Sequence, residues 1–160
     1  MITVQILCVG KLKEKFYTDA AAEYVKRLSG YCRLAVTELP EERLPQNPSQ
    51  AQIAAALEKE GELAAARIPK GAAVTALCVE GKLLSSEELA ARIEGWAGTG
   101  RSSLAFLIGG SYGMSPALKA RAELRLSMSP MTFPHHLARV MLLEQIYRAY
   151  QINAGTKYHK

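Results

Sequence analysis

Two groups of residues in this chain could do chemistry, and the first is a glycine-rich turn. Gly109, Gly110 and Gly113 follow a short apolar run, so the backbone there can turn sharply and approach a ligand without an intervening Cβ. In open α/β sheets, ligands bind at the carboxyl ends of strands, beside turns of this kind. The turn therefore predicts a ligand site, with a tight connection that binds nothing as the alternative. It matches neither GxGxxG nor GxxxxGK[ST], so it does not by itself indicate a nucleotide.

The second group is a set of histidines and a tyrosine near the C-terminus. His135 and His136 end a proline-containing loop, and His159 follows Tyr158 in a polar tail. An imidazole can act as a base, contact phosphate or bind a metal. Adjacent histidines point in different directions, so we expect no metal site, and one of them could instead cap or turn into the final helix. The tail residues could reach a substrate if the tail docks, whereas its polar composition favours a frayed, solvated end.

The elements that must position these residues follow from periodicity and capping signals. The predicted strands are Ile2–Val9, Tyr31–Leu39, Ala72–Val79, Leu104–Ile108 and Leu124–Ser127. The predicted helices are Phe16–Leu28, one from Ser49 to about Arg67, one opening at Ser85 and running through Trp96, Pro116–Ala122, and Leu137–Ala154. Strands that alternate with helices are typical of a parallel sheet covered on both faces. We therefore expect residues 1–160 to form one three-layer α/β domain.

Composition excludes several classes of protein. The 160 residues are 49% hydrophobic and 22% charged, which is typical of a folded protein and not of a disordered one. No apolar run approaches the roughly 18 residues of a membrane span, and the N-terminus reads as a strand instead of a signal peptide. Cys8, Cys32 and Cys78 are widely spaced, which favours reduced thiols in the cytoplasm and no zinc site.

Charge points to the last third of the chain. The net charge is +5 and the pI is about 9.2, which permits a polyanionic partner without requiring one. From residue 117 onward, Glu123 and Glu144 are the only acids. The basic residues of this stretch are Lys119, Arg121, Arg125, Arg139, Arg148, Lys157 and Lys160. We therefore expect contacts with phosphate in this part of the chain.

The last predicted helix is unusually apolar. Residues such as Val140, Leu143, Ile146 and Tyr150 occupy more than one face of Leu137–Ala154. A helix that is apolar on several sides is buried more deeply than a surface helix. The pattern therefore favours a second cover for this helix, and a homodimer interface would supply it.

Several motifs, in order along the whole chain, resemble the RlmH family of SPOUT-class 23S rRNA (pseudouridine-N3)-methyltransferases. These motifs are Val9-Gly-Lys-Leu-Lys, Ile108-Gly-Gly-Ser-Tyr-Gly, Met131-Thr-Phe-Pro-His, Leu143-Glu-Gln-Ile-Tyr-Arg-Ala-Tyr and the closing Tyr158-His-Lys. The most specific part is the combination of the glycine turn, the Thr-Phe-Pro-His loop and the terminal Tyr-His.

The resemblance implies an α/β fold with a C-terminal trefoil knot that holds S-adenosylmethionine, largely through backbone groups. Carried over by position, the cofactor contacts are Leu77, Gly109, Met128, Ser129, Pro130, Met131, Thr132 and Phe133. It also implies a homodimer with a substrate pocket shared between subunits. One departure is Cys78, where the resemblance implies an acidic residue that could contact the cofactor ribose.

The resemblance further implies a substrate and a reaction. The substrate is a pseudouridine in the stem-loop of large-subunit rRNA that bridges to the small subunit, presented by the assembled ribosome. N3 of that base carries a proton at neutral pH, so a base must remove it. We assign this chemistry first to His159 and Tyr158, then to His135, with Arg148 holding phosphate or the base carbonyl. The alternatives are a non-catalytic RNA-binding protein of the same fold and a SPOUT methyltransferase of another RNA site, such as tRNA.

Overall fold

A five-stranded parallel sheet forms the centre of the protein, in a computed structural model that describes residues 1–160. The strand order is β2-β1-β4-β3-β5, and every pairing is parallel. The strands are β1 (Thr3–Val9), β2 (Arg33–Leu39), β3 (Ala73–Leu83), β4 (Ser103–Ile108) and β5 (Leu124–Ser127). The helices are α1 (Lys15–Leu28), α2 (Gln50–Arg67), α3 (Ser86–Gly98), α4 (Pro116–Lys119) and α5 (His135–Asn153). The predicted parallel α/β class is confirmed.

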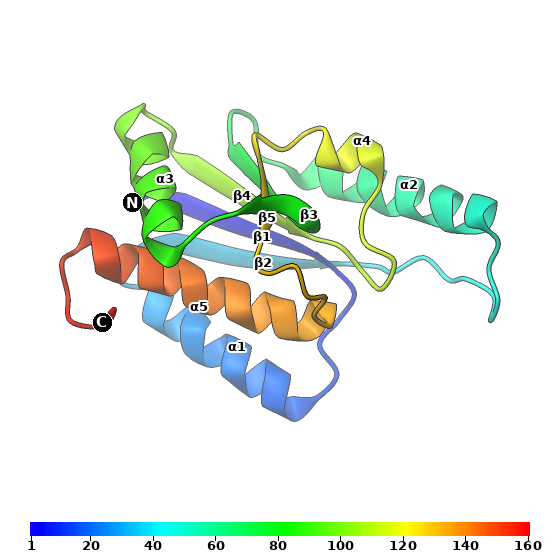
Figure 1. Cartoon of the computed structure of the whole chain (residues 1–160), viewed down its shortest axis with the longest axis horizontal. Helices are drawn as coiled ribbons and strands as arrows, with labels where there is room; N and C mark the ends of the chain where they lie inside the picture. The colour runs from blue at the N-terminus through cyan, green and yellow to red at the C-terminus, as the bar shows by residue number, and fades with distance from the viewer.

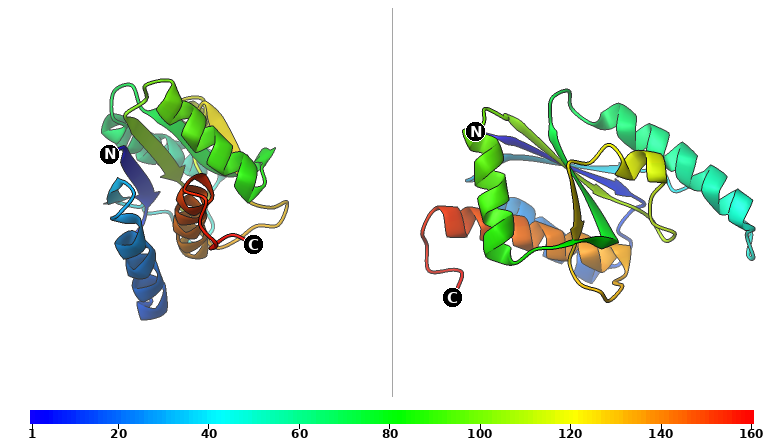
Figure 2. Two further views of the ribbon diagram at one scale, coloured as in Figure 1. Left: turned by 90° about the vertical axis from the view of Figure 1, so that its left-hand side faces the viewer. Right: turned by 45° about the horizontal axis from the view of Figure 1, so that its top comes forward.

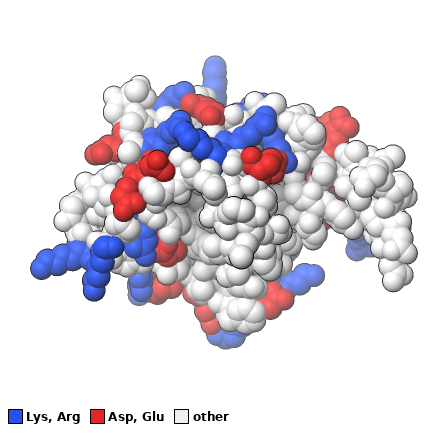
Figure 3. Space-filling view, in the orientation of Figure 1, with Lys and Arg blue, Asp and Glu red and all other residues white.

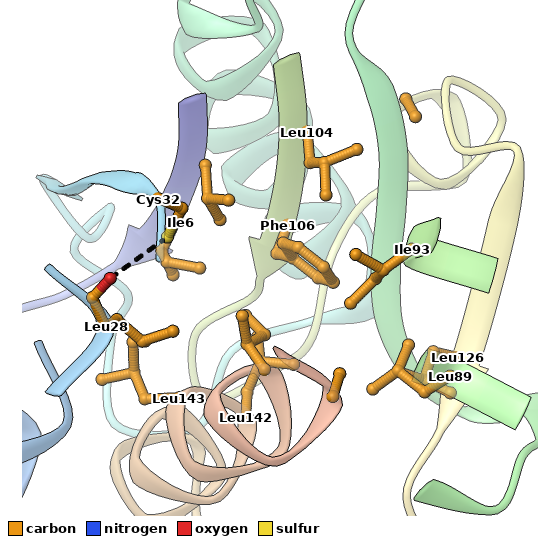
Figure 4. Packing of buried hydrophobic residues seen from close by; sticks show 14 of the residues in the cluster. Ile6, Leu28, Cys32, Leu89, Ile93, Leu104, Phe106, Leu126, Leu142 and Leu143 are labelled. Carbon is orange, nitrogen blue, oxygen red and sulfur yellow. Dashed lines mark hydrogen bonds between the residues drawn. The ribbon is translucent and has the colours of Figure 1, made fainter. Parts of the chain in front are cut away.

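The helices form two layers, one on each face of the sheet (Figures 1 and 2). Helices α1, α3 and α5 cover one face, and α2 and α4 cover the other. Strand β4 shows how the sequence divides between them, because successive side chains of a strand point to opposite faces. Leu104, Phe106 and Ile108 belong to the first core, whereas Ala105 and Leu107 belong to the second. Figure 4 shows the Phe106 ring in this first core, beside Ile93 of α3 and above Leu142 of α5.

Helix α5 is buried, as its sequence predicted, but the elements that cover it belong to the same chain. It packs between α1 and α3 and against the sheet, and Leu142, Leu143 and Ile146 are fully buried in this way. The apolar pattern therefore needs no second subunit to explain it. The homodimer stays a prediction that must be argued from the site.

Most observed helix and strand boundaries lie within one or two residues of those that capping and periodicity patterns predicted. Both predicted capping boxes form: Ser49 and Ser85 each accept the N–H of the third helical residue, whose side chain returns to the capping residue's N–H. Several boundaries differ by one or more residues, and β2 begins at Arg33 instead of Tyr31. Helix α4 ends three residues before Ala122, β3 continues past Val79, and α5 begins at His135 instead of Leu137.

The extension of β3 beyond Val79 is irregular. Leu126 of β5 pairs with both Leu77 and Lys82, so the four residues between those two are excluded from the ladder. Gly81 lies in this excursion, and a Cβ there would meet the carbonyl oxygen of Arg125 at 2.6 Å. The close passage of β5 over this bulge is thus possible only with glycine. Threading of the chain into a knot stays a prediction. No helix combines the length and the apolar character needed to cross a membrane.

Candidate active site

The principal cavity of the protein opens at the carboxyl ends of β3, β4 and β5 and has a volume of about 680 Å³. Seven of the eight predicted cofactor residues line it, and Pro130 is the exception. Those seven are Leu77, Gly109, Met128, Ser129, Met131, Thr132 and Phe133. Three separate segments of the chain therefore meet at one place, which is the edge of the sheet where the glycine turn predicted a ligand site.

The glycine turn is tight for a definite reason. Gly110 and Gly113 form an isolated antiparallel bridge, and the N–H of Gly113 donates to the carbonyl of Gly110 at 3.0 Å. A Cβ at Gly109 would lie 2.4 Å from the carbonyl oxygen of Gly113, and Gly113 itself has a φ of +86°. Side chains rarely tolerate either condition. The turn thus presents bare backbone groups to the cavity.

The wall of the cavity contributed by β3 carries a cysteine and an ion pair. Glu80 pairs with Lys119, and the hydrogen bond from that lysine lowers the pKa of the Glu80 carboxyl. Burial raises the pKa of the Cys78 thiol, so this position offers a neutral group at physiological pH. A weak hydrogen-bond donor therefore stands where the resemblance implies a carboxylate.

His135 lines the cavity from the first turn of α5. Neither histidine caps the helix, because the N-cap position belongs to Pro134 and no side chain bonds there; the capping alternative was wrong. The Nε2 atom of His135 is buried without a hydrogen-bond partner, and a Cβ on Gly10 would lie 3.6 Å from it. Nδ1 of His135 forms no hydrogen bond either, so neither ring nitrogen is engaged by another residue. Burial, and then the neighbouring His136, lower the pKa of His135, so its ring is neutral at physiological pH.

The C-terminal tail is docked and not frayed. The hydroxyl of Tyr158 donates to Oε1 of Glu144 at 3.1 Å, and its ring packs edge-on against Tyr147 with centroids 4.9 Å apart. Burial, and then Glu144, raise the pKa of Tyr158, so the hydroxyl remains a donor. The prediction of a solvated tail was therefore wrong, because the tail finds its partners on α5.

His159 is held on both sides of its ring. The guanidinium of Arg148 lies 3.0 Å from Nδ1, and Oε1 of Glu87 lies 2.6 Å from Nε2. A guanidinium can only donate, so Nδ1 accepts and Nε2–H donates to the carboxylate. Arg148 is fixed in turn by Glu144, whose Oε1 accepts from its Nε at 2.9 Å and from its Nη2 at 2.6 Å. In this arrangement neither ring nitrogen of His159 is free to take a proton.

The predicted site residues therefore fall into two groups. His135 and the cofactor residues surround the cavity, whereas Arg148, Tyr158 and His159 gather farther along α5 and do not line it. Arg148 lies thirteen residues after His135, which is about 20 Å along a helix. Figure 1 shows the tail returning along the end of α5 opposite to the one that faces the carboxyl ends of the strands.

Sequence reasoning missed the acids that hold these groups. Glu144 and Arg148 have the i, i+4 spacing of a helical ion pair, so this contact could have been found. Glu87 precedes its partner His159 by 72 residues, and no local signal announces it. Arg139 was expected near phosphate, but it is buried and bonded to Glu38 at 2.6 Å. Figure 3 shows basic and acidic side chains interspersed over one face, without a single basic field.

The cavity fits a compact cofactor that has both apolar and polar parts. Its volume lies within the range of small-molecule sites, and its walls combine apolar side chains such as Leu77, Met128 and Phe133 with exposed backbone groups of the glycine turn. No group of three or more His, Cys, Asp or Glu side chains is arranged to hold a metal ion.

Comparison with known proteins identifies the class of this fold and site. Residues 2–159 match the family model described as predicted SPOUT methyltransferase. Ribosomal RNA large subunit methyltransferase H of Bifidobacterium adolescentis is 50% identical over 157 residues, covering 98% of this chain and 99% of that protein. The protein of the same name from Clostridium novyi (strain NT) is 50% identical over 159 residues, covering 99% and 100%. The chain therefore belongs to the ribosomal RNA large subunit methyltransferase H family of SPOUT methyltransferases.

Solved structures show the same fold at low sequence identity. A probable methylase family protein from Haemophilus influenzae Rd KW20 has a TM-score of 0.56 and 13% identity, covering 98% of this chain and 70% of its own. A putative methyltransferase from Legionella pneumophila, in complex with its bound cofactor S-adenosylmethionine, has a TM-score of 0.50 and 14% identity, covering 95% and 66%. Membership of the family makes the chain a methyltransferase, and these structures show that it shares the fold of other methyltransferases.

Proposed function

We propose that this enzyme methylates N3 of a pseudouridine in the inter-subunit bridge stem-loop of large-subunit rRNA, and that it does so on assembled ribosomes in the cytoplasm. Relatives at 50% identity carry the name ribosomal RNA large subunit methyltransferase H, which supports large-subunit rRNA as the substrate class. The observation that carries the proposal is the cavity itself. Its glycine turn, β3 end and Met128–Phe133 loop lie together, with His135 at the wall.

We propose S-adenosylmethionine as the cofactor, and the residues present suit it. Gly109 and the adjoining turn would offer backbone groups to its polar parts, and Leu77, Met128 and Phe133 would enclose its apolar surface, with Ser129, Met131 and Thr132 completing the loop. When bound, S-adenosylmethionine supplies an electrophilic methyl group on a sulfonium that leaves as a neutral thioether. Enclosure by these residues excludes water and aligns the nucleophile with that methyl group.

The target nitrogen must lose its proton as its bond to the methyl carbon forms. His135 suits this task better than His159, because His135 is neutral and its Nδ1 is unpartnered, whereas both nitrogens of His159 are occupied. We therefore assign proton acceptance to His135. Arg148, Tyr158 and His159 form a preorganised group of donors that suits a base carbonyl or a phosphate.

The separation of the two groups along α5 supports a homodimer with shared sites. One copy's tail lies about 20 Å of helix away from its own cavity, so a second copy would be needed to bring the partner subunit's Tyr158 and His159 to it. We propose this arrangement as the complete site. The small size of the chain and its interspersed surface charge favour a substrate that the assembled ribosome presents.

The decisive experiment is methyl transfer from labelled S-adenosylmethionine to purified ribosomes that lack the modification, with the product nucleoside identified by mass spectrometry. We expect N3-methylpseudouridine from the bridging stem-loop, with intact ribosomes as better substrates than free large-subunit rRNA. Cofactor binding without transfer to ribosomes would point to another RNA, such as tRNA. Absence of both binding and transfer would leave a non-catalytic RNA-binding protein.

Mixing two inactive variants tests the shared site. A cavity variant, Phe133→Ala, and a tail variant, His159→Ala, each disable every site of their own homodimer. If sites are shared, mixed dimers combine an intact cavity with an intact partner tail, and the mixture regains activity that neither variant has alone. A mixture that stays inactive although mixed dimers are detected by mass would overturn the shared site.

A further inference from the structure

The connection from β1 to α1 presents a second feature beside the cavity. This connection and the first turn of α1 expose Lys11, Lys13 and Phe16, next to the half-buried Tyr17, and we call these four residues the Lys11–Tyr17 surface. Glu14 and Lys15, which lie between them in the sequence, are exposed as well. Phe16 is 65% exposed, which is unusual for a large aromatic side chain in a protein with a well-packed core. Its ring lies against Tyr17 with centroids 4.4 Å apart, so two aromatic rings stand together at the surface.

Hydrogen bonds to Arg139 and Glu38 fix the backbone of this connection. Nη2 of the buried Arg139 donates to the carbonyl of Gly10 at 3.0 Å, and its Nη1 donates to Oε2 of Glu38 at 2.6 Å. The same carboxylate accepts the N–H of Leu12 at 3.0 Å, and the Leu12 side chain packs against the core. The backbone on both sides of Lys11 is thus fixed, and Lys11 and Lys13 project from an anchored segment.

The lysines of this surface form no ion pair of their own. Neither Lys11 nor Lys13 has a carboxylate within 4 Å, although the charge of Lys11 is close enough to help lower the pKa of the Glu38 carboxyl. That carboxylate is bonded to Arg139, and Asp19 pairs with Lys15 at 2.6 Å. Two ammonium groups without an ion pair and an exposed aromatic pair therefore share a short stretch of chain. Such a combination suits a ligand with both negative charge and flat apolar faces.

The surface adjoins the mouth of the proposed active site. A Cβ on Gly10 would lie 3.6 Å from His135 Nε2 and 4.0 Å from His136 Nε2, and the Tyr17 ring packs edge-on against His136 with centroids 6.2 Å apart. Figure 1 shows the beginnings of α1 and α5 at the same end of the molecule as the carboxyl ends of the strands. A strand of RNA whose target base enters the cavity would pass over this surface.

We propose that the Lys11–Tyr17 surface binds the RNA next to the target nucleotide, with Lys11 and Lys13 on phosphates and Phe16 stacked on an unpaired base. The assignment extends the proposed function, on which it rests, by locating the RNA contact. Stacking on aromatic rings and ammonium–phosphate contacts are how proteins hold single-stranded loops. A second copy of the chain is the competing occupant, but it would have to supply carboxylates for both lysines.

The test measures ribosome binding by sedimentation over a range of salt concentrations, separately from methyl transfer. The test variants are K11A/K13A and Phe16→Ala, and Phe16→Trp should preserve stacking. The control K26A/K70A removes the same charge from two exposed lysines away from the cavity. Cofactor affinity by calorimetry and molecular mass by light scattering show whether each variant keeps its cavity and its oligomeric state.

We expect K11A/K13A to lower the slope of log affinity against log salt by about 1.5, because each lost phosphate contact removes roughly 0.7–0.9. Phe16→Ala should weaken ribosome binding on the order of tenfold, while Phe16→Trp, cofactor affinity and mass stay unchanged. Equal losses for K11A/K13A and K26A/K70A, or dissociation of the oligomer by Phe16→Ala, would overturn the proposal. Lysine- and Phe16-dependent binding without methyl transfer would instead refute the proposed function and leave this surface as an RNA contact.

Discussion

Helix α5 connects two regions that are built in opposite ways. The cavity end, formed by the glycine turn, His135 and Arg139, exposes backbone groups and leaves His135 Nε2 without a partner. The tail end, formed by Glu87, Glu144, Arg148, Tyr158 and His159, satisfies its polar side chains with each other. A region that must bind a ligand keeps hydrogen-bonding groups without partners in the protein. A region that presents side chains to a substrate benefits when those side chains are already fixed.

The largest effect should come from breaking the cavity end at Gly109. In Gly109→Ala the new methyl would lie 2.4 Å from a backbone oxygen, which cannot move aside as a flexible side chain would. The turn must shift, and we expect cofactor affinity by calorimetry to fall on the order of a hundredfold. Gly95→Ala is the matched control, because that helical position has open space. It should bind normally and gain about 0.5–1 kcal/mol of stability. Equal binding by both variants would contradict the role of the turn.

The next effect concerns the anchor beneath the cavity end. Arg139→Met keeps the side-chain volume but leaves Glu38 without its cation and Gly10 without its donor. We expect the free energy of unfolding in urea to drop by about 3 kcal/mol. Arg33→Met, at an exposed arginine with no ion pair, should change it by less than about 0.5 kcal/mol. A loss no greater than that of the control would show that the Arg139–Glu38 pair contributes nothing.

The same pair predicts how stability depends on pH. Burial alone would raise the pKa of Glu38, but hydrogen bonds from Arg139 and from the N–H of Leu12 outweigh it, and the pKa is lowered. The carboxylate therefore stabilises the fold fully above its unfolded pKa of about 4.3, and this contribution disappears as pH falls through the lower folded value. The stability difference between wild type and Glu38→Gln should be full at neutral pH and shrink under strong acid. A difference independent of pH would exclude this ionisation as its cause.

At the tail end, Glu144→Gln should reduce the rate of methyl transfer. The amide keeps the shape but loses the charge that holds Arg148 and accepts from Tyr158. A charge-assisted hydrogen bond contributes about 1.5–3 kcal/mol, so kcat should fall on the order of tenfold. Cofactor affinity should not change, since Glu144 does not line the main cavity. The control is Glu94→Gln, an exposed glutamate of α3. Weaker cofactor binding in Glu144→Gln would contradict the separation of the two ends.

The smallest effect should come from Glu87→Gln. The hydrogen bond with His159 lowers the pKa of Glu87, but its side chain is 61% exposed, so water competes for the contact. We expect a decrease in kcat of about threefold or less, since exposed pairs contribute little. The difference from wild type should vanish at high ionic strength, which screens the pair. A loss as large as that of Glu144→Gln would mean that Glu87 participates directly in the reaction.

The sequence determined those features that depend on neighbours within a few residues. The capping boxes at Ser49 and Ser85, the apolar run of β4 and the glycines after it follow from local sterics and hydrogen bonding. Motif resemblance added the family, and with it a set of cofactor residues of which the structure brings seven to one cavity. The resemblance alone did not establish the role of each site residue.

Only the tertiary structure decided which distant groups meet. The polar tail looked free because its partners Glu144 and Glu87 lie 14 and 72 residues away from the residues they bind. Arg139 looked like a phosphate ligand because its partner Glu38 lies 101 residues earlier. Gly10 approaches His135 only because α5 begins beside the end of β1. Such contacts arise when whole elements pack to bury their apolar faces, and no local pattern encodes which polar groups that packing brings together.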